Sequence, residues 1–183
     1  MIKKALLVFA SACLIWQSVK MLFNIQQLQP ESWLVIVFLA WVLNMFITGV
    51  FAFAGFALPT ERMMPASYYQ IRWPDRLKRV YTYFGVAVFR KFLLATLWKK
   101  KSQRKKYFNG RADGIQNLVE QSKKSEFGHL IPFFILTLLS VSFITGGQFE
   151  FGLTVVVINF IGNGYPVVLQ RHHRMRVARL LKK

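Results

Sequence analysis

The sequence predicts an all-α membrane protein with four transmembrane helices and further amphipathic helices at the membrane surface. Of its 183 residues, 54% are hydrophobic, yet the formal charge is +18. A chain that is both strongly apolar and strongly basic is typical of a membrane protein with a cationic face. Four apolar stretches approach the roughly 20 residues that a helix needs to cross a bilayer. We therefore expect one membrane domain over residues 1–183.

The four expected spans differ in length and in what precedes them. In the first, Lys3 and Lys4 stand before an apolar run that resembles the start of a signal peptide. The run continues past Cys13, so we expect a retained helix. The third span is the shortest and suits thinner lipid or a small tilt. The spans are expected at residues 5–23, 33–58, 130–145 and 149–169.

The distribution of basic residues predicts the orientation. The segment 59–128 holds 16 of the 25 Lys and Arg, and the remainder precede residue 21 or follow residue 169. The connections 24–32 and 146–148 contain none. Because cytoplasmic loops are enriched in Lys and Arg, both termini and the central segment are expected in the cytoplasm. We expect the protein in the bacterial cytoplasmic (inner) membrane.

The basic central segment, residues 59–128, mixes aromatic and basic side chains in a way that suits helices in the lipid headgroup layer. A fifth crossing over residues 80–98 would place Arg90 and Lys91 at its centre, which is costly. This stretch is therefore expected to be re-entrant or interfacial. The basic run 99–111 is expected to be solvated, and the helix after it leads towards the third span.

A carboxylate and an imidazole stand three residues apart where polar residues run into the third span. In a continuous helix, Glu126 and His129 would lie on the same side. A carboxylate bonded to one imidazole nitrogen makes the other a better base. We predict that His129 is a general base and that Glu126 orients it. The plainer alternative, that Glu126 ends a surface helix and His129 anchors it at the interface, stays open.

The last expected span contains two amides, Asn159 and Asn163, spaced four apart on one face. Polar side chains inside an apolar span commonly face the bundle interior, often at a site. Gly162, Gly164 and Pro166 predict a locally loosened helix whose freed carbonyls need partners. The alternative is helix packing through small residues, with the amides as bridges between helices.

The connection between the third and fourth spans is short, so these spans are expected to be antiparallel neighbours, about 8–10 Å apart. Their cytoplasmic ends then meet. Glu126 and His129 are thereby predicted to lie beside a polar and basic group that begins the C-terminal helix, expected over residues 170–183. This group comprises Gln170, Arg171, His172, His173 and Arg174.

Other chemistries fit the sequence less well. Adjacent histidines, such as His172 and His173, point about 100° apart on a helix and make a poor joint metal site. The common nucleotide-binding and hydrolase motifs do not occur, and one cysteine excludes an internal disulfide. The positive charge follows membrane sidedness, so no nucleic-acid partner is expected. We expect no metal and no bound cofactor.

Two motifs carry a family resemblance. The stretch QSKKSEFGH, residues 121–129, and the stretch NGYPVVLQRHHRMR, residues 163–176, resemble the glycosyl-4,4'-diaponeurosporenoate acyltransferases, a family of small membrane proteins. The similarity extends over roughly residues 68–181. The positions that match the family pattern are Glu126, His129, Asn163, Gln170, Arg171, His173 and Arg174.

The resemblance implies that a fatty acyl group is transferred from a thioester donor, such as acyl-CoA, to a sugar hydroxyl of a lipid-linked acceptor. It implies that Arg171 or Arg174 stabilises the oxyanion or binds donor phosphates, that Asn163 and Gln170 position the acceptor, and that His173 belongs to the substrate site. The expected partners are membrane lipids and a glycolipid acceptor. The alternative is a noncatalytic membrane subunit that binds another protein or anionic lipid.

Overall fold

The structure, a computed structural model, describes residues 2–27, 32–96 and 113–180. Within these ranges the chain is helical and contains no strand. Four helical stretches are long and apolar enough to cross a membrane, as the sequence predicted. The expected basic run 99–111 lies outside the described residues. The four stretches are Ile2–Ile25, Trp33–Ala57, Gly114–Thr145 and Phe149–Arg179.

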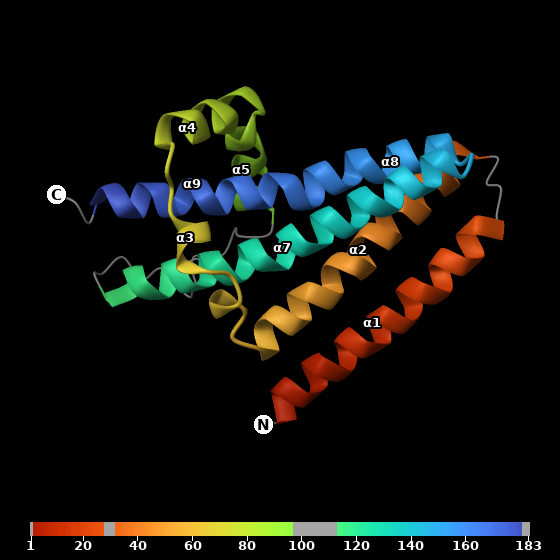
Figure 1. Cartoon of the computed structure of the whole chain (residues 1–183), viewed down its shortest axis with the longest axis horizontal. Coiled ribbons are helices and arrows are strands. Elements are labelled where there is room, and N and C mark those ends of the chain that lie inside the picture. Colours follow the sequence, from red (N-terminus) through yellow and green to blue (C-terminus); the bar gives the residue numbers. More distant parts are fainter. Residues whose placement is uncertain (1, 28–31, 97–112, 181–183) are drawn as a thin grey trace. The chain divides into compact units, whose positions relative to one another are not determined.

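Figure 1 shows the helices of the described ranges in chain order. The third and fourth candidate spans are longer than expected, because each continues well beyond its apolar part. The elements are α1 (Ile2–Gln27), α2 (Trp33–Ala57), the 3₁₀ turn η1 (Thr60–Arg62), α3 (Ala66–Tyr69), α4 (Pro74–Tyr83), α5 (Val86–Ala95), α7 (Asp113–Thr145), α8 (Phe149–Asn159), the π-helical turn η2 (Phe160–Gly164) and α9 (Tyr165–Leu180).

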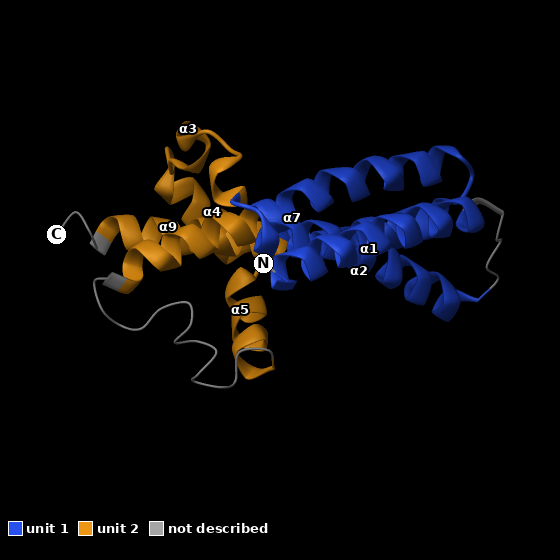
Figure 2. Ribbon diagram, turned by 90° about the horizontal axis from the view of Figure 1, so that it is seen from below, with its two compact units in different colours: residues 1–59, 127–164 blue, residues 60–126, 165–183 orange. Residues whose placement is uncertain are grey.

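The chain divides into two compact units (Figure 2). Unit 1 contains residues 1–59 and 127–164, and unit 2 contains residues 60–126 and 165–183. Both later boundaries fall inside helical chain: one within α7 between Glu126 and Phe127, the other where η2 meets α9.

Unit 1 is a bundle of α1, α2, the second part of α7 and α8, and successive helices run antiparallel (Figure 1). Helices α1 and α2 approach closely, since a Cβ at Gly49 would lie 2.7 Å from Leu14. Ser11 donates a hydrogen bond to the carbonyl of Val50 across the same contact. The buried apolar core is formed by Ile25, Ile36, Ala40, Leu43, Ile47, Leu136, Phe143, Phe151 and Val155.

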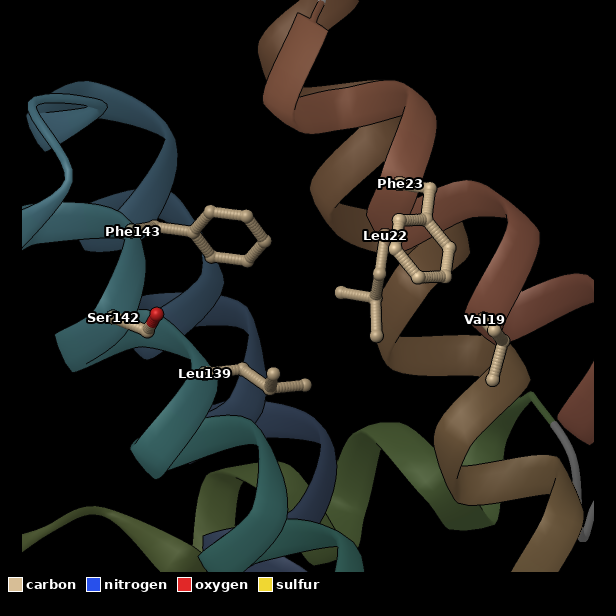
Figure 3. A pocket seen from close by; sticks show the side chains of 6 residues that line it. All are labelled: Val19, Leu22, Phe23, Leu139, Ser142 and Phe143. Atoms are coloured by element: carbon tan, nitrogen blue, oxygen red, sulfur yellow. The ribbon is translucent and has the colours of Figure 1, made fainter.

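An apolar cavity of about 300 Å³ lies between the later part of α1 and α7. Figure 3 shows side chains of the two helices lining it from opposite sides. Much of α1 also exposes large apolar side chains, which is ordinary for a helix surrounded by lipid. The cavity is lined by Val19, Leu22, Phe23, Leu139, Ser142 and Phe143.

The hairpin between α7 and α8 depends on two glycines. Gly147 adopts a φ of +88°, a left-handed conformation that glycine adopts without a steric penalty. Gly152 lets the helices approach, since a Cβ there would lie 2.6 Å from Ile144 and 2.8 Å from the carbonyl oxygen of Ser140. The short connection therefore produces antiparallel neighbours, as expected.

Unit 2 contains α3, α4, α5, the first part of α7 and α9. Pro74 begins α4, a position where its missing N–H is not needed. Gly85, with a φ of +63°, separates α4 from α5. Helix α5 has ten residues and spans about 15 Å, half of a hydrocarbon core. It is too short to cross alone. The small core consists of Tyr81, Val86 and Leu169 with Phe89, Leu93, Tyr165 and Val168.

Replacing Gly152 by valine is expected to destabilise the α7–α8 hairpin. The added side chain meets the backbone of α7, and such overpacking costs about 1–3 kcal/mol. Thermal unfolding in detergent measures the loss. The matched control is Val157→Leu on the exposed face of α8, which should leave the unfolding temperature unchanged. Equal unfolding temperatures for Gly152→Val and the wild type would contradict this packing.

Candidate functional site

His129 lies in the part of α7 that belongs to unit 1, three residues before Pro132. Its Nδ1 is 3.0 Å from Oδ1 of Asn163 in η2. The backbone of Gly162 also lies close to the ring. In a regular α-helix the Gly162 carbonyl would accept from residue 166, which is a proline without an N–H. The imidazole is thus held by a segment whose helical hydrogen bonding is incomplete.

The hydrogen bonds continue from Asn163 into the bundle. Nδ2 of Asn163 donates to Oδ1 of Asn159 at 3.0 Å, and Thr48 of α2 donates to Oδ1 of Asn163 at 3.1 Å. Nδ2 of Asn159 donates to the carbonyl of Phe133 at 2.9 Å and to Oγ1 of Thr137 at 3.2 Å. We call this chain of contacts the His129 relay. Its members are His129, Asn163, Asn159, Thr48, Phe133 and Thr137.

The π-helical turn η2 carries one of the two relay amides. Asn159 and Asn163 are each only 1% exposed, so a lost partner would leave a polar atom without water. The structure confirms that the sequence around Gly162, Gly164 and Pro166 loosens the helix, and that the amides face the bundle interior. Wide turns of this kind occur frequently at functional sites.

Glu126 belongs to unit 2 and is fully buried there. Its Oε1 accepts from Nε of Arg171 at 2.8 Å and from the hydroxyl of Tyr68 at 2.7 Å. Its Oε2 accepts from Nη2 of Arg174. The guanidinium groups of Arg171 and Arg174 also lie over the rings of Tyr68 and Tyr69, at 4.7 and 5.2 Å. We call these five residues the Glu126 cluster.

The two arginines of the Glu126 cluster differ in access. The side chain of Arg171 is 33% exposed, whereas that of Arg174 is 6% exposed. Since one carboxylate faces two guanidinium groups, the cluster retains one positive charge. Arg171 presents that charge to a ligand more readily, and Arg174 lies inside the packing.

Burial and the neighbouring carboxylate keep both tyrosines of the cluster neutral. Burial, followed by the hydrogen bond to Glu126, raises the pKa of Tyr68 to about 12. Burial and the charge of Glu126 likewise raise the pKa of Tyr69. Tyr68 therefore acts as a hydroxyl donor to the carboxylate throughout the physiological range.

Gln170 fastens α9 to the first part of α7 within unit 2. Its Nε2 donates to Oγ of Ser125 at 3.1 Å, and its backbone carbonyl accepts from the hydroxyl of Ser122 at 3.1 Å. Ser122 also accepts from Nη1 of Arg174 at 3.0 Å. The predicted approach of Glu126 to the polar and basic group on α9 is confirmed through Arg171 and Arg174.

The other two histidines have different surroundings. His172 stacks on Tyr81 of α4, with ring centroids 3.8 Å apart. His173 is partly buried, and Arg90 and Arg176 are among the charged groups that act on it. In the part of the chain that the structure describes, no group of three or more His, Cys, Asp or Glu side chains is arranged to hold a metal ion.

The two residues of the predicted catalytic pair thus have different partners. The structure shows His129 with Asn163 and Gly162, and Glu126 with arginines and a tyrosine. That Glu126 orients His129 stays a prediction. Ser122 was not singled out, although it lies in the first motif one helical turn before Glu126. Sequence reasoning also missed Tyr68 and Thr48, which contact site residues 58 and 115 positions away in the chain. Nothing in their own spacing signalled these contacts.

Replacing Glu126 by glutamine is expected to destabilise the protein by about 3–5 kcal/mol, because two guanidinium groups lose their buried counter-charge. Thermal or denaturant unfolding measures the change. The control is Glu61→Gln, whose carboxylate lies 3.5 Å from Lys124 and 3.8 Å from exposed Arg62. This control should cost less than Glu126→Gln, because both cations near Glu61 are more exposed than Arg174 and lie at longer distances. Equal losses of stability in the two variants would contradict the larger contribution expected from the Glu126 ion pairs.

The raised pKa of Tyr68 predicts a pH dependence of stability. The neutral hydroxyl is favoured in the folded state, where the pKa is about 12 against 10.0 normally. Its stabilising effect is therefore complete below about pH 10 and is lost as the pH rises through 12. The free energy of unfolding, measured from pH 9 to 12, should fall more steeply in the wild type than in Tyr68→Phe. The variant lacks the contribution of Tyr68 and keeps that of Tyr69. Parallel curves would contradict the proposed environment of Tyr68.

Comparison with known proteins identifies the family. No curated protein and no solved structure matches this chain. The family model described as glycosyl-4,4'-diaponeurosporenoate acyltransferase matches residues 65–183, which include all of the predicted site residues. This range covers more than half of the chain and agrees with the resemblance seen in the two motifs. The chain therefore belongs to the glycosyl-4,4'-diaponeurosporenoate acyltransferase family.

Proposed function

We propose that this protein transfers a fatty acyl group from a thioester donor, such as acyl-CoA, to a sugar hydroxyl of a lipid-linked acceptor, with His129 as the general base. One observation carries the proposal: an imidazole held at Nδ1 by a buried amide among apolar helices, in a chain of an acyltransferase family. An imidazole fixed through one nitrogen is well placed to take a proton with the other.

In this reaction the acceptor hydroxyl gives its proton to His129 as its oxygen attacks the thioester carbonyl. The resulting tetrahedral intermediate carries a negative oxygen. The carbon–sulfur bond then breaks, the ester forms, and the proton held by the imidazolium passes to the departing thiolate. No other reactant is consumed, so one histidine serves as base and then as acid.

The membrane setting suits these substrates. A fatty acyl chain and a lipid-linked acceptor both partition into the bilayer, whereas the thioester and the sugar hydroxyl stay near its surface. The four candidate spans and the short helix α5 are consistent with a site at that depth. We place this surface on the cytoplasmic side of a bacterial inner membrane, where the basic residues are expected.

Arg171 is our candidate for contact with the donor. Its Nε is fixed by Glu126, and a third of its side chain is exposed, so part of the side chain is accessible to a ligand. A fixed guanidinium stabilises a developing oxyanion or binds donor phosphates. Arg174, Gln170 and His173 complete the proposed substrate-binding set, with Arg174 acting mainly through Glu126 and Ser122.

Changing His129 to alanine is expected to reduce acyl transfer by about 10²- to 10⁴-fold, the usual contribution of a general base. Full-length protein in nanodiscs is incubated with a long-chain acyl-CoA and a glycosylated lipid, and the esterified product is measured by mass spectrometry. The matched control is His172→Ala, which removes a histidine stacked on Tyr81 and should retain most of the activity.

Undiminished turnover by a folded His129→Ala protein would remove His129 from the mechanism. The noncatalytic alternative makes a different prediction: the wild-type protein and both variants would form no ester, and lipid extracts from cells lacking the protein would contain the same acylated glycolipids as complemented cells. Loss of one acylated glycolipid from such cells, restored by the wild type alone, supports the enzyme.

A further inference from the structure

We infer that Asn159 and Asn163 set the tautomer of His129, so that Nδ1 carries the proton and Nε2 is the nitrogen that acts as the base. In this role both amides are positioning residues. The assignment of the base to Nε2 rests on the proposed function, whereas the tautomer itself does not. The inference follows from the direction in which each hydrogen bond of the His129 relay must run.

The backbone carbonyl of Phe133 fixes the direction of the hydrogen bonds in the relay. The oxygen of Phe133 can only accept, so the group of Asn159 that lies 2.9 Å away must be its NH₂. Thr137 uses its single hydroxyl proton on the same carbonyl, at 2.7 Å. Its oxygen therefore accepts the second N–H of Asn159, at 3.2 Å. Both donors of Asn159 are used, and its Oδ1 is left to face Asn163.

The same reasoning fixes the orientation of the Asn163 amide. Asn163 must present its NH₂ to Oδ1 of Asn159, at 3.0 Å, so its own oxygen faces the other way. That oxygen meets Thr48 at 3.1 Å and Nδ1 of His129 at 3.0 Å. Both groups must then donate. Reversing either amide would set oxygen against oxygen among apolar side chains, where no water compensates.

A neutral imidazole carries one proton. If Nδ1 holds it, Nε2 has a free lone pair, which is the requirement for a base. The backbone of Gly162 is a second neighbour of the ring. The relay thus orients the ring before proton transfer.

Nitrogen-15 NMR of the full-length protein in nanodiscs tests the tautomer directly. Histidine is labelled at both ring nitrogens, and the His129 signals are assigned by their loss in His129→Ala. The expected result is one neutral form with the proton on Nδ1. A proton on Nε2 of His129 in the wild-type protein would overturn the inference.

Variants test whether the amides cause this state. Asn163→Leu should give a mixture of tautomers and lower kcat by about 10²-fold with little change in KM. Asn163→Asp keeps an acceptor opposite Nδ1, so the tautomer and part of kcat should return. The control is Asn44→Leu: Asn44 is a buried amide of the same unit whose Nδ2 bonds to the carbonyl of Ala40 in its own helix. This control should leave the tautomer unchanged.

The outcomes separate the two proposals. An Nδ1–H tautomer in a protein whose His129→Ala variant remains active would end the proposed role of His129 and leave the tautomer assignment standing. An inactive His129→Ala variant together with an unchanged tautomer in Asn163→Leu would end the inference alone. Equal effects of Asn44→Leu and Asn163→Leu would show only general sensitivity of the bundle, and the inference would fail.

Discussion

A polar atom inside an apolar helical bundle has no water to bond, and this constraint organises the described structure. Each buried amide of the relay finds its partner on another helix or one turn away, and the buried carboxylate of Glu126 accepts from three side chains. Leaving such a group unpaired costs more than any single hydrogen bond contributes. The polar contacts of the His129 relay and of the Glu126 cluster therefore come as connected sets.

Pro166 and the neighbouring glycines weaken the last span close to the His129 relay. Pro166 removes the N–H that would otherwise bond to Gly162, and η2 widens the turn that carries Asn163. Pro132 of α7 similarly leaves the carbonyl of Gly128 without its helical donor. Interrupted helices in membrane proteins are tolerated where neighbouring groups satisfy the freed backbone. Here the proposed catalytic side chain lies close to the backbone of Gly162.

The buried ion pairs of Glu126 serve position more than stability. Removing charges from water is costly, so a buried pair is weak evidence for net stabilisation, although breaking it is destabilising. What the carboxylate does provide is orientation: it fixes one edge of Arg171 while part of that side chain stays accessible. A guanidinium held in this way stabilises charge with little reorganisation. Such preorganisation matches the demands of acyl transfer.

The sequence by itself determined the helical class, the number of candidate spans and the face on which Asn159 and Asn163 meet, because hydrophobic length and helical spacing are local properties. It also located His129, Glu126, Arg171 and Arg174 through two short motifs. The approach of Glu126 to the two arginines also followed from the short connection between the last two spans, whereas the tertiary structure alone decided the partners on more distant elements. Tyr68 reaches Glu126 across 58 residues, and Thr48 reaches Asn163 across 115. No spacing along one helix encodes such contacts, since they depend on how separate helices pack.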